Sequence, residues 1–271
     1  MKIKTDNYEI YKGDCLELMK DIPDKSVDMI LCDLPYGTTA CKWDNVIPFE
    51  LLWEQYGRII KDNGAIVLFG IQPFTTIMIN SNINNFKHQW IWDKKNGSNF
   101  MNLKRHPNKV HEDIVVFGNN GKTVNYYPQM TKGKMRTKGN EKSYSEDGVY
   151  HAYTTTKTKN DLYYPKSIIE FSNAGRTGKA KKVHPTQKPV DLLEYLIKTY
   201  TNEGEIVLDN CMGSGSTGIA CIHTNRNFIG MELEEKYFNI AKNRMESELN
   251  NIPYIKNDIH TDIKNEKVSL F

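Results

Sequence analysis

The sequence predicts an α/β fold, in which helices cover a doubly wound and mostly parallel sheet. Short runs rich in β-branched and aromatic residues alternate with amphipathic stretches, as they do where helices connect parallel strands. Several of these runs are apolar at nearly every position, which is typical of strands covered on both faces. Acidic residues directly follow three of the runs, namely Asp33, Asp209 and Glu232. Because ligands of such sheets bind beyond the carboxyl ends of strands, these residues mark a candidate site.

The strands are predicted from the apolar runs at residues 8–11, 27–32, 65–69, 89–92, 114–117, 205–208 and 228–231. Helices are predicted between them, over residues 48–61, 73–81, 189–200, 217–223 and 234–249. In the first of these helices Leu51, Leu52 and Ile59 recur at helical spacing, and Asn63-Gly64 provides a stop.

The composition limits the classes of protein to which the chain can belong. With 271 residues, 39% of them hydrophobic, the chain can bury one substantial core. No apolar stretch approaches the roughly 20 residues that span a bilayer, and the first ten residues contain no apolar signal region. The five cysteines are scattered and form no C-x-x-C pair, which argues against a disulfide framework or a zinc site. We therefore expect a cytoplasmic protein with no membrane partner and no metal.

The segment 121–183 interrupts the alternation of strands and helices. Its thirteen Lys and Arg side chains against five Asp and Glu give a net charge of +8, which leaves −5 for the rest of a chain whose total is +3. Such a concentration is typical of a surface that binds a polyanion, and a solvated basic loop is the alternative. We expect an inserted lobe or long loops here, between two halves of one domain at 1–120 and 184–250, with a polar tail at 251–271.

The first motif is Asp33-Leu34-Pro35-Tyr36, directly behind a predicted strand. The amino group outside an adenine or cytosine ring is a poor nucleophile, because its lone pair is delocalised into the ring. The Asp33 carboxylate and the Leu34 carbonyl could accept its two N–H groups and localise that lone pair. Pro35 stiffens the turn, and Tyr36 offers a ring on which an extruded base can stack. The alternative is a turn that ends a strand and exposes a tyrosine.

The second motif is the glycine-rich segment from Asp209 to Thr217. Gly213 and Gly215 permit backbone conformations that other residues avoid. Hydroxyl groups at the start of the next helix come from Ser214, Ser216 and Thr217. Glu232 lies 19 residues after Gly213, which is the spacing at which an acidic residue binds ribose hydroxyls. No Lys follows the last glycine, so the pattern favours an adenosine cofactor other than ATP, and a plain packing turn is the alternative.

Two further segments complete the candidate site. The first is the segment 184–189, which reads His184-Pro185-Thr186-Gln187-Lys188-Pro189 and precedes a predicted helix. The N-terminus of that helix could meet an anionic group, and Lys188 could neutralise a carboxylate. A proline-rich helix entry with a surface lysine is the alternative. The loop 37–44 follows Tyr36 and is placed to touch a substrate that enters beside Asp33.

These motifs resemble those of the DNA methyltransferases that methylate amino groups with S-adenosylmethionine, in particular the β-class, in which a D-P-P-Y motif precedes the cofactor motif. Residues 33–36 match D-P-P-Y with Leu34 in place of the first proline. Residues 209–217 match D-P-F-x-G-S-G-T with Asn210 and Cys211 in place of Pro-Phe, and residues 184–189 match H-P-T-Q-K-P. Gly13-Asp14-Cys15 resembles the short element near the cofactor adenine.

The resemblance implies a seven-stranded, Rossmann-like sheet with one reversed strand, a circularly permuted order of motifs and a target-recognition lobe in the basic insert. The implied catalytic residues are Asp33, Leu34, Pro35 and Tyr36. The implied cofactor-binding residues are Asp14, Cys15, Asp33, His184, Thr186, Lys188, Asp209, Gly213, Ser214, Gly215, Ser216, Thr217 and Glu232. The candidates for DNA binding are Thr39, Lys42 and Trp43, and Lys132, Lys134 and Arg136 as representatives of the insert.

The function implied by the resemblance is methylation of adenine N6 in a short sequence of double-stranded DNA, on a base flipped out of the duplex. Asp33 favours adenine, because enzymes that methylate cytosine N4 usually carry serine there. A cytosine-N4 or RNA amino-methyltransferase is one alternative. A catalytically idle DNA-binding homologue is another, and the presence of both Asp33 and Tyr36 argues against it. A second copy of the chain and a cognate restriction endonuclease are the further partners expected.

Overall fold

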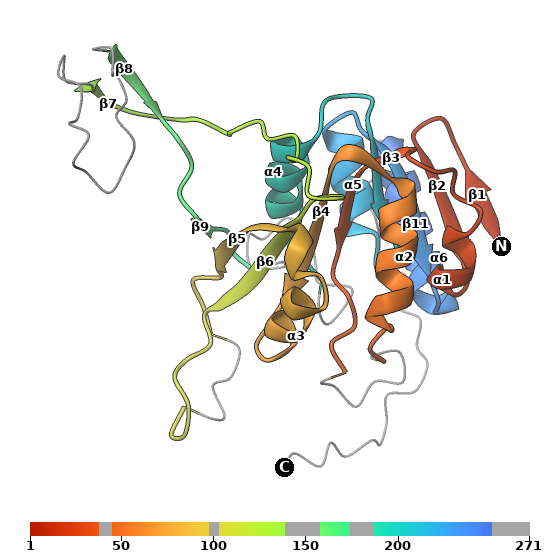
Figure 1. Cartoon of the computed structure of the whole chain (residues 1–271). Coiled ribbons are helices and arrows are strands. Elements are labelled where there is room, and N and C mark those ends of the chain that lie inside the picture. Colours follow the sequence, from red (N-terminus) through yellow and green to blue (C-terminus); the bar gives the residue numbers. More distant parts are fainter. Residues whose placement is uncertain (38–44, 98–102, 139–157, 174–186, 251–271) are drawn as a thin grey trace.

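The computed structural model describes residues 1–37, 45–97, 103–138, 158–173 and 187–250 (Figure 1). In this part of the chain, nine strands form one sheet in the order β1-β2-β11-β10-β3-β4-β6-β5-β9. Its strands are β1 (Lys2–Lys4), β2 (Tyr8–Lys12), β3 (Val27–Cys32), β4 (Ile60–Gly70), β5 (Phe86–Asp93), β6 (His111–Phe117), β9 (Ile168–Glu170), β10 (Ile206–Asp209) and β11 (Asn227–Glu232).

All seven predicted strands are present, and they form the interior of this sheet as β2, β3, β4, β5, β6, β10 and β11. Among these seven only β6 is reversed, because it pairs antiparallel with both β4 and β5. The sheet is larger than predicted, since β1 and β9 extend it at its two edges. Each has only three residues and mostly exposed side chains, so neither produces an apolar run that a sequence pattern would reveal.

The five predicted helices are also present, and a sixth helix was missed. The helices are α1 (Cys15–Met19), α2 (Phe49–Ile59), α3 (Phe74–Ser81), α4 (Val190–Tyr200), α5 (Ser216–His223) and α6 (Glu235–Leu249), with a 3-10 turn η1 (Ile83–Asn85). The missed helix α1 has five residues, which is too short for a helical period to show. Its start is fixed by Asp14, whose carboxylate accepts the Leu16 N–H at 2.8 Å.

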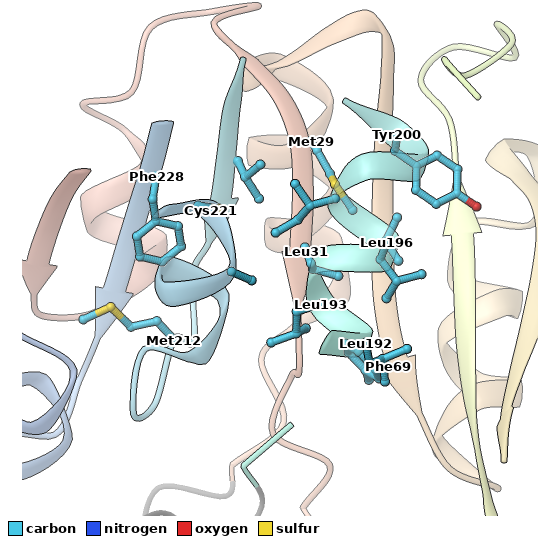
Figure 2. Packing of buried hydrophobic residues seen from close by; sticks show 14 of the residues in the cluster. Met29, Leu31, Phe69, Leu192, Leu193, Leu196, Tyr200, Met212, Cys221 and Phe228 are labelled. Carbon is cyan, nitrogen blue, oxygen red and sulfur yellow. The ribbon is translucent and has the colours of Figure 1, made fainter. Parts of the chain in front are cut away.

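Two hydrophobic clusters cover the two faces of the sheet, and Figure 1 shows the helices that lie on either side of it. Buried side chains of α1, α2 and α3 belong to one cluster, and those of α4, α5 and α6 belong to the other. Figure 2 shows Leu193 and Leu196 of α4 beside Leu31 of β3. Full burial of such a side chain contributes about 1.5–3 kcal/mol. The fold therefore depends on the near-continuous apolar strands that the sequence displays.

The helices change faces between two adjacent strands. β10 is followed by α5 on one face, whereas β3 is followed by α2 on the other. β10 and β3 are parallel neighbours in the sheet. Ligands of doubly wound sheets bind at such a switch point, so the topology places the candidate site at the carboxyl ends of β10 and β3.

The three helices on the second face are tied by a histidine. The ring nitrogens of His223 on α5 lie 2.6 Å from a Glu194 oxygen on α4 and 2.7 Å from a Glu248 oxygen on α6. Lys198 also lies 3.6 Å from Glu194. This bridge fixes α4, α5 and α6 relative to one another on the solvent side of their packing.

The segment 121–183 contributes a separate two-stranded sheet and the edge strand β9. β7 (Thr131–Lys138) and β8 (Thr158–Tyr163) pair antiparallel and lie away from the main sheet (Figure 1). The Arg136 guanidinium lies 3.5 Å from the centroid of the Tyr163 ring and donates to the Leu162 carbonyl at 3.0 Å. The expected tail 251–271 lies outside the described residues. None of the described helices is long and apolar enough to cross a membrane.

Candidate active site

Four neighbouring parallel strands bring the predicted site residues to one edge of the sheet. Asp33 follows β3, Asp209 ends β10, Glu232 ends β11, and Asp14 follows β2. The strands pair in the order β2, β11, β10, β3, so these four carboxylates form a row along the carboxyl edge. The sequence predicted three members of this row, Asp33, Asp209 and Glu232, from strand ends, whereas Asp14 was named only through the resemblance.

The carboxylate of Asp33 is held by two hydrogen bonds. The Tyr36 hydroxyl donates to Asp33 Oδ1 at 2.6 Å, and Lys188 Nζ donates to Oδ2 at 2.7 Å. The Tyr36 ring packs against Phe74 of α3, with ring centroids 4.8 Å apart. The Leu34 side chain is only 4% exposed and anchors the turn in the core. Because 23% of the Asp33 side chain remains exposed, a substrate can still reach this fixed carboxylate.

Lys188 contacts a second carboxylate, which the sequence did not reveal. Its Nζ lies 3.2 Å from Glu112 Oε2, while Lys94 donates to Glu112 Oε1 at 3.1 Å. The Lys188 side chain is only 10% exposed. The sequence predicted that Lys188 could neutralise a carboxylate, and in the structure its described ion-pair partners are Asp33 and Glu112.

The charges in this cluster shift one another's ionisation. Burial raises the pKa of the Asp33 carboxyl, Glu112 adds to that shift, and Lys188 opposes it. Burial alone would lower the pKa of Lys188, but Asp33 and Glu112 outweigh it and the net shift is upward. Burial likewise opposes ionisation of Glu112, yet Lys188 and Lys94 outweigh it and lower its pKa. Lys188 therefore stays charged between two carboxylates.

The glycine-rich turn is organised by Asp209. Its Oδ2 accepts the Thr217 hydroxyl at 2.6 Å, and its Oδ1 accepts the Cys211 N–H at 3.1 Å. Burial raises the pKa of Asp209 to about 6, against the opposing effect of these hydrogen bonds. Asp209 and Thr217 thus bond to each other and hold the turn.

The glycines of the turn have left-handed backbone conformations. Gly213 has a φ of 51° and Gly215 a φ of 76°, a region that residues with a side chain rarely adopt. The Gly213 N–H donates to Glu232 Oε2 at 2.9 Å, and the Glu234 N–H donates to Oε1 at 2.7 Å. Burial is the main cause that raises the pKa of Glu232. The turn and the end of β11 are therefore locked together through this carboxylate.

The two serines of the turn face the protein. Arg244 of α6 donates to the Ser214 carbonyl, to Ser214 Oγ at 3.0 Å and to Ser216 Oγ at 3.4 Å. Both serines are buried, at 3% and 7% exposure. The resemblance implied that both serines bind the cofactor, and in the structure both hydroxyl oxygens accept from Arg244.

A polar contact joins the turn to the opposite face of the sheet. The Tyr56 hydroxyl of α2 donates to Asn210 Oδ1 at 2.6 Å. Asn210 Nδ2 in turn lies 3.5 Å from the sulfur atoms of Cys15 and Cys211. Cys15, predicted near a cofactor adenine, is buried. The residues that replace Pro-Phe in the motif are thus bonded into the core.

The remaining predicted residues lie either outside the described part of the chain or on β7. Thr39, Lys42, Trp43, His184 and Thr186 lie outside the described residues. Lys132 and Lys134 are exposed on β7, and Arg136 stacks on Tyr163. In the described part of the chain, no group of three or more His, Cys, Asp or Glu side chains is arranged to hold a metal ion.

The residues at the ends of β2 and β11 fit an adenosine group. Each oxygen of the Glu232 carboxylate accepts one backbone N–H and retains a lone pair for a ribose hydroxyl. Leu233, directly after it, is 57% exposed and offers apolar surface for an adenine ring. The Gly13 N–H donates to the Glu232 carbonyl at 3.0 Å, which brings the exposed Asp14 to the same place.

Comparison with known proteins identifies the family. A family model described as DNA methylase, N6_N4_Mtase, matches residues 27–243. The chain belongs to this DNA methylase family. It is thus a DNA methyltransferase of the N6/N4 group, and the matched region extends from β3 to α6 and contains both strand ends at the switch point.

Similar relatives of this DNA methylase include both curated proteins and solved structures. Type II methyltransferase M.HpaI of Haemophilus parainfluenzae is 29% identical over 251 residues, 88% of this chain and 74% of that protein. DNA adenine methyltransferase YhdJ of Escherichia coli strain K12 is 26% identical over 250 residues, 88% of this chain and 82% of that protein. The structure of the M1.HpyAVI–SAM complex has a TM-score of 0.58 and 27% identity, covering 88% of this chain and 99% of that chain.

A second solved structure shows how far the likeness extends beyond adenine enzymes. The cytosine-N4-specific PvuII DNA methyltransferase has a TM-score of 0.63 at 17% identity, over 88% of this chain and 86% of that chain. At this identity the likeness shows a shared fold alone. The fold of this DNA methylase is therefore common to enzymes of both base specificities and does not by itself determine the base.

Proposed function

We propose that this DNA methylase transfers a methyl group from S-adenosylmethionine to the N6 amine of an adenine that is flipped out of double-stranded DNA. The observation that carries the proposal is the Asp33 carboxylate, held in one orientation by Tyr36 and Lys188 at the switch point of the sheet. A relative in complex with SAM and an adenine-specific relative support the cofactor and the base.

The chemistry requires an acceptor whose position is fixed before the base arrives. The Asp33 carboxylate and the Leu34 carbonyl would each accept one N–H of the adenine amine. These hydrogen bonds would localise the nitrogen lone pair, which can then attack the methyl group. Positive charge develops on the nitrogen as it attacks, so an ionised Asp33 stabilises the transition state more than the ground state. Asp33 Oδ1 and Oδ2 each accept one protein hydrogen bond, which leaves lone pairs for the amine.

Methyl transfer from S-adenosylmethionine to the adenine amine requires no further reactant. S-adenosylmethionine supplies an electrophilic methyl group, and its sulfur keeps the bonding pair when the carbon–sulfur bond breaks. The adenine nitrogen forms the new bond to carbon and then releases one proton toward Asp33 or water. Pro35 has a fixed φ and stiffens the turn that presents the Leu34 carbonyl, and the Tyr36 ring provides an aromatic surface for the base.

DNA would approach the same edge of the sheet. β6 begins there, and the loop before it carries the exposed residues Lys104 and Arg105. Cations beside the site favour binding of a phosphate backbone. The basic insert would add a second such surface through β7 and β8. A homodimer and a cognate restriction endonuclease remain part of the proposal, the latter because relatives are named Type II methyltransferases.

Transfer of a labelled methyl group from S-adenosylmethionine to DNA tests the proposal, with the product nucleoside identified by mass spectrometry. We expect N6-methyladenine. Asp33→Asn should lower kcat by roughly 10²–10³, the usual effect of losing one preorganised group, while binding of cofactor and DNA stays within a few-fold. Asp6→Asn, at an exposed position, is the matched control. N4-methylcytosine as the product would refute adenine specificity, and unchanged turnover of Asp33→Asn would remove Asp33 from the mechanism.

A further inference from the structure

A chain of alternating charges runs from the candidate catalytic carboxylate into the protein. Tyr36 and Lys188 bond to Asp33 at 2.6 Å and 2.7 Å. Lys188 lies 3.2 Å from Glu112, and Glu112 accepts from Lys94 at 3.1 Å. All three Lys and Glu side chains are well covered, with 10%, 16% and 5% exposure for Lys188, Glu112 and Lys94. Such a poorly solvated network of charges constrains all of its members, because a buried charge that loses its partner destabilises the fold.

We infer that Lys188 and Glu112 are positioning residues, which set the orientation and the basicity of Asp33, and that Lys188 does not anchor the carboxylate of the cofactor. The inference rests on the proposed function. Lys188 would orient Asp33 by occupying Oδ2, and Glu112 would hold Lys188 from the side away from the base.

The surroundings of the Lys188 ammonium support this assignment. An ammonium has three donors and no acceptor. Two carboxylates lie within 3.2 Å of Lys188 Nζ, and the centroid of the Phe69 ring lies 4.9 Å away, at a distance typical of a cation–π contact. These partners come from the ends of β3 and β4 and from the start of β6. Within the described residues the ammonium thus has one hydrogen bond, to Asp33, one ion pair, to Glu112, and one cation–π contact, to Phe69.

Glu112 supplies a second negative charge beside the ion pair of Lys188 and Asp33. If Lys188 faced Asp33 alone, it would draw charge from that carboxylate and weaken it as an acceptor. If Lys188 were absent, two carboxylates would face each other across a poorly solvated gap. With Lys94 included, the chain from Asp33 to Lys94 contains two anions and two cations, so its own charges sum to zero. The positive charge that develops during transfer then meets an undiminished Asp33 carboxylate.

The ionisable groups around Asp33 allow the inference to be tested by charge. They are Tyr36 in the same turn, Lys188 before α4, Glu112 on β6, Cys32 on β3 and Asp209 on β10. Lys188 lowers the pKa of Asp33, and Glu112 raises it. Asp33 carries the negative charge that stabilises the transition state only when it is ionised, so its pKa sets an acid limb in the rate of methyl transfer. Removing Lys188 should move that limb to higher pH, and removing the Glu112 charge should move it to lower pH.

Three variants of the full chain test this: Lys188→Met, Glu112→Gln and the double variant. Single-turnover methyl transfer across pH should show the two single variants displaced in opposite directions, each by about one pH unit, or tenfold in rate on the limb. The double variant should lie between them. Asp209 is common to all of them and cannot produce opposite displacements. Lys198→Met, on the exposed side of α4, is the control for losing a lysine.

Calorimetric binding of S-adenosylmethionine separates the inference from the proposed function. A dissociation constant within about threefold of the wild type for Lys188→Met supports a positioning role. A loss of tenfold or more (about 1.4 kcal/mol) with an unmoved acid limb would overturn it, because Lys188 would then anchor the cofactor. If Lys188→Met does not fold, Glu112→Gln and Lys188→Arg carry the test, and a limb that Glu112→Gln leaves in place refutes it. Wild-type protein that binds the cofactor without methylating an exocyclic amine would instead refute the proposed function.

Discussion

Gly215 offers the sharpest test of how the glycine-rich turn is built. It precedes α5 in the left-handed conformation, with φ 76° and ψ 26°. A Cβ at this position would lie 2.9 Å from the Ala241 Cβ and 3.1 Å from the Ala241 Cα on α6. Replacing Gly215 by Ala should therefore disturb both the turn and the packing of α6 behind it.

The expected magnitude has two parts. A left-handed conformation costs a residue with a side chain roughly 1–2 kcal/mol, and forcing an extra carbon into a packed interior costs roughly 1–3 kcal/mol. Gly215→Ala should thus lower the free energy of unfolding by about 2–5 kcal/mol. Gly204 is a matched control, because its φ is 79° and nothing lies within 4 Å of its added Cβ. Gly204→Ala should show only the first part.

Urea unfolding of the two variants measures the difference, and calorimetry measures binding of S-adenosylmethionine. We expect the affinity to fall at least tenfold in Gly215→Ala and to stay unchanged in Gly204→Ala. In a double-mutant cycle, Ala241→Gly should remove about 1 kcal/mol or more of the cost of Gly215→Ala. Equal destabilisation by the two glycine substitutions, or no coupling to Ala241, would show that the contact with α6 does not constrain the turn.

Two further predictions concern surface charges. Replacing Lys132 and Lys134 together by Ala should weaken DNA binding and reduce the slope of log affinity against log salt by about 0.9 for each phosphate that the protein no longer neutralises. A slope that stays unchanged in the lysine pair would place those lysines away from DNA. Arg136→Ala should instead loosen the pairing of β7 and β8, because the guanidinium stacks on Tyr163. Burial opposes ionisation of His223, but its bonds to Glu248 and Glu194 outweigh it and raise its pKa above 6.5. The stability that the ionised His223 contributes should be fully present below pH 6.5 and lost as pH rises through the folded pKa. Urea unfolding should therefore show His223→Gln to be more destabilising at pH 6 than at pH 8. An equal loss of stability at both pH values would argue against an ionised bridge.

Strand positions were predictable because burial on both faces of a sheet requires apolar residues at successive positions. The runs that became β3 and β4 are apolar at almost every position, and β3 is fully buried. β7 and β8 gave no such signal, because polar strands that pair only with each other need no apolar period. In the same way β1 and β9 are defined by a neighbouring strand and not by their own residues.

The candidate site was predictable where it lies at the carboxyl ends of parallel strands, and it was missed elsewhere. Asp33, Asp209 and Glu232 follow that rule directly. Glu112 does not, because β6 is antiparallel and its amino end lies at the edge where the other strands have their carboxyl ends. The bond from Lys188 to Asp33 joins residues 155 positions apart. Only the tertiary structure could show that Lys188 has carboxylates of this chain as partners.

The departures from the family motif also become intelligible once their partners are visible. Asn210 stands where the motif has proline, and it accepts the hydroxyl of Tyr56, whose side chain is fully buried. A proline there would leave that hydroxyl without its acceptor, at a cost of about 1–3 kcal/mol. Its amide also meets the sulfur atoms of Cys15 and Cys211. The substituted pair at 210 and 211 is thus matched by contacts with Tyr56 of α2 and Cys15 of α1.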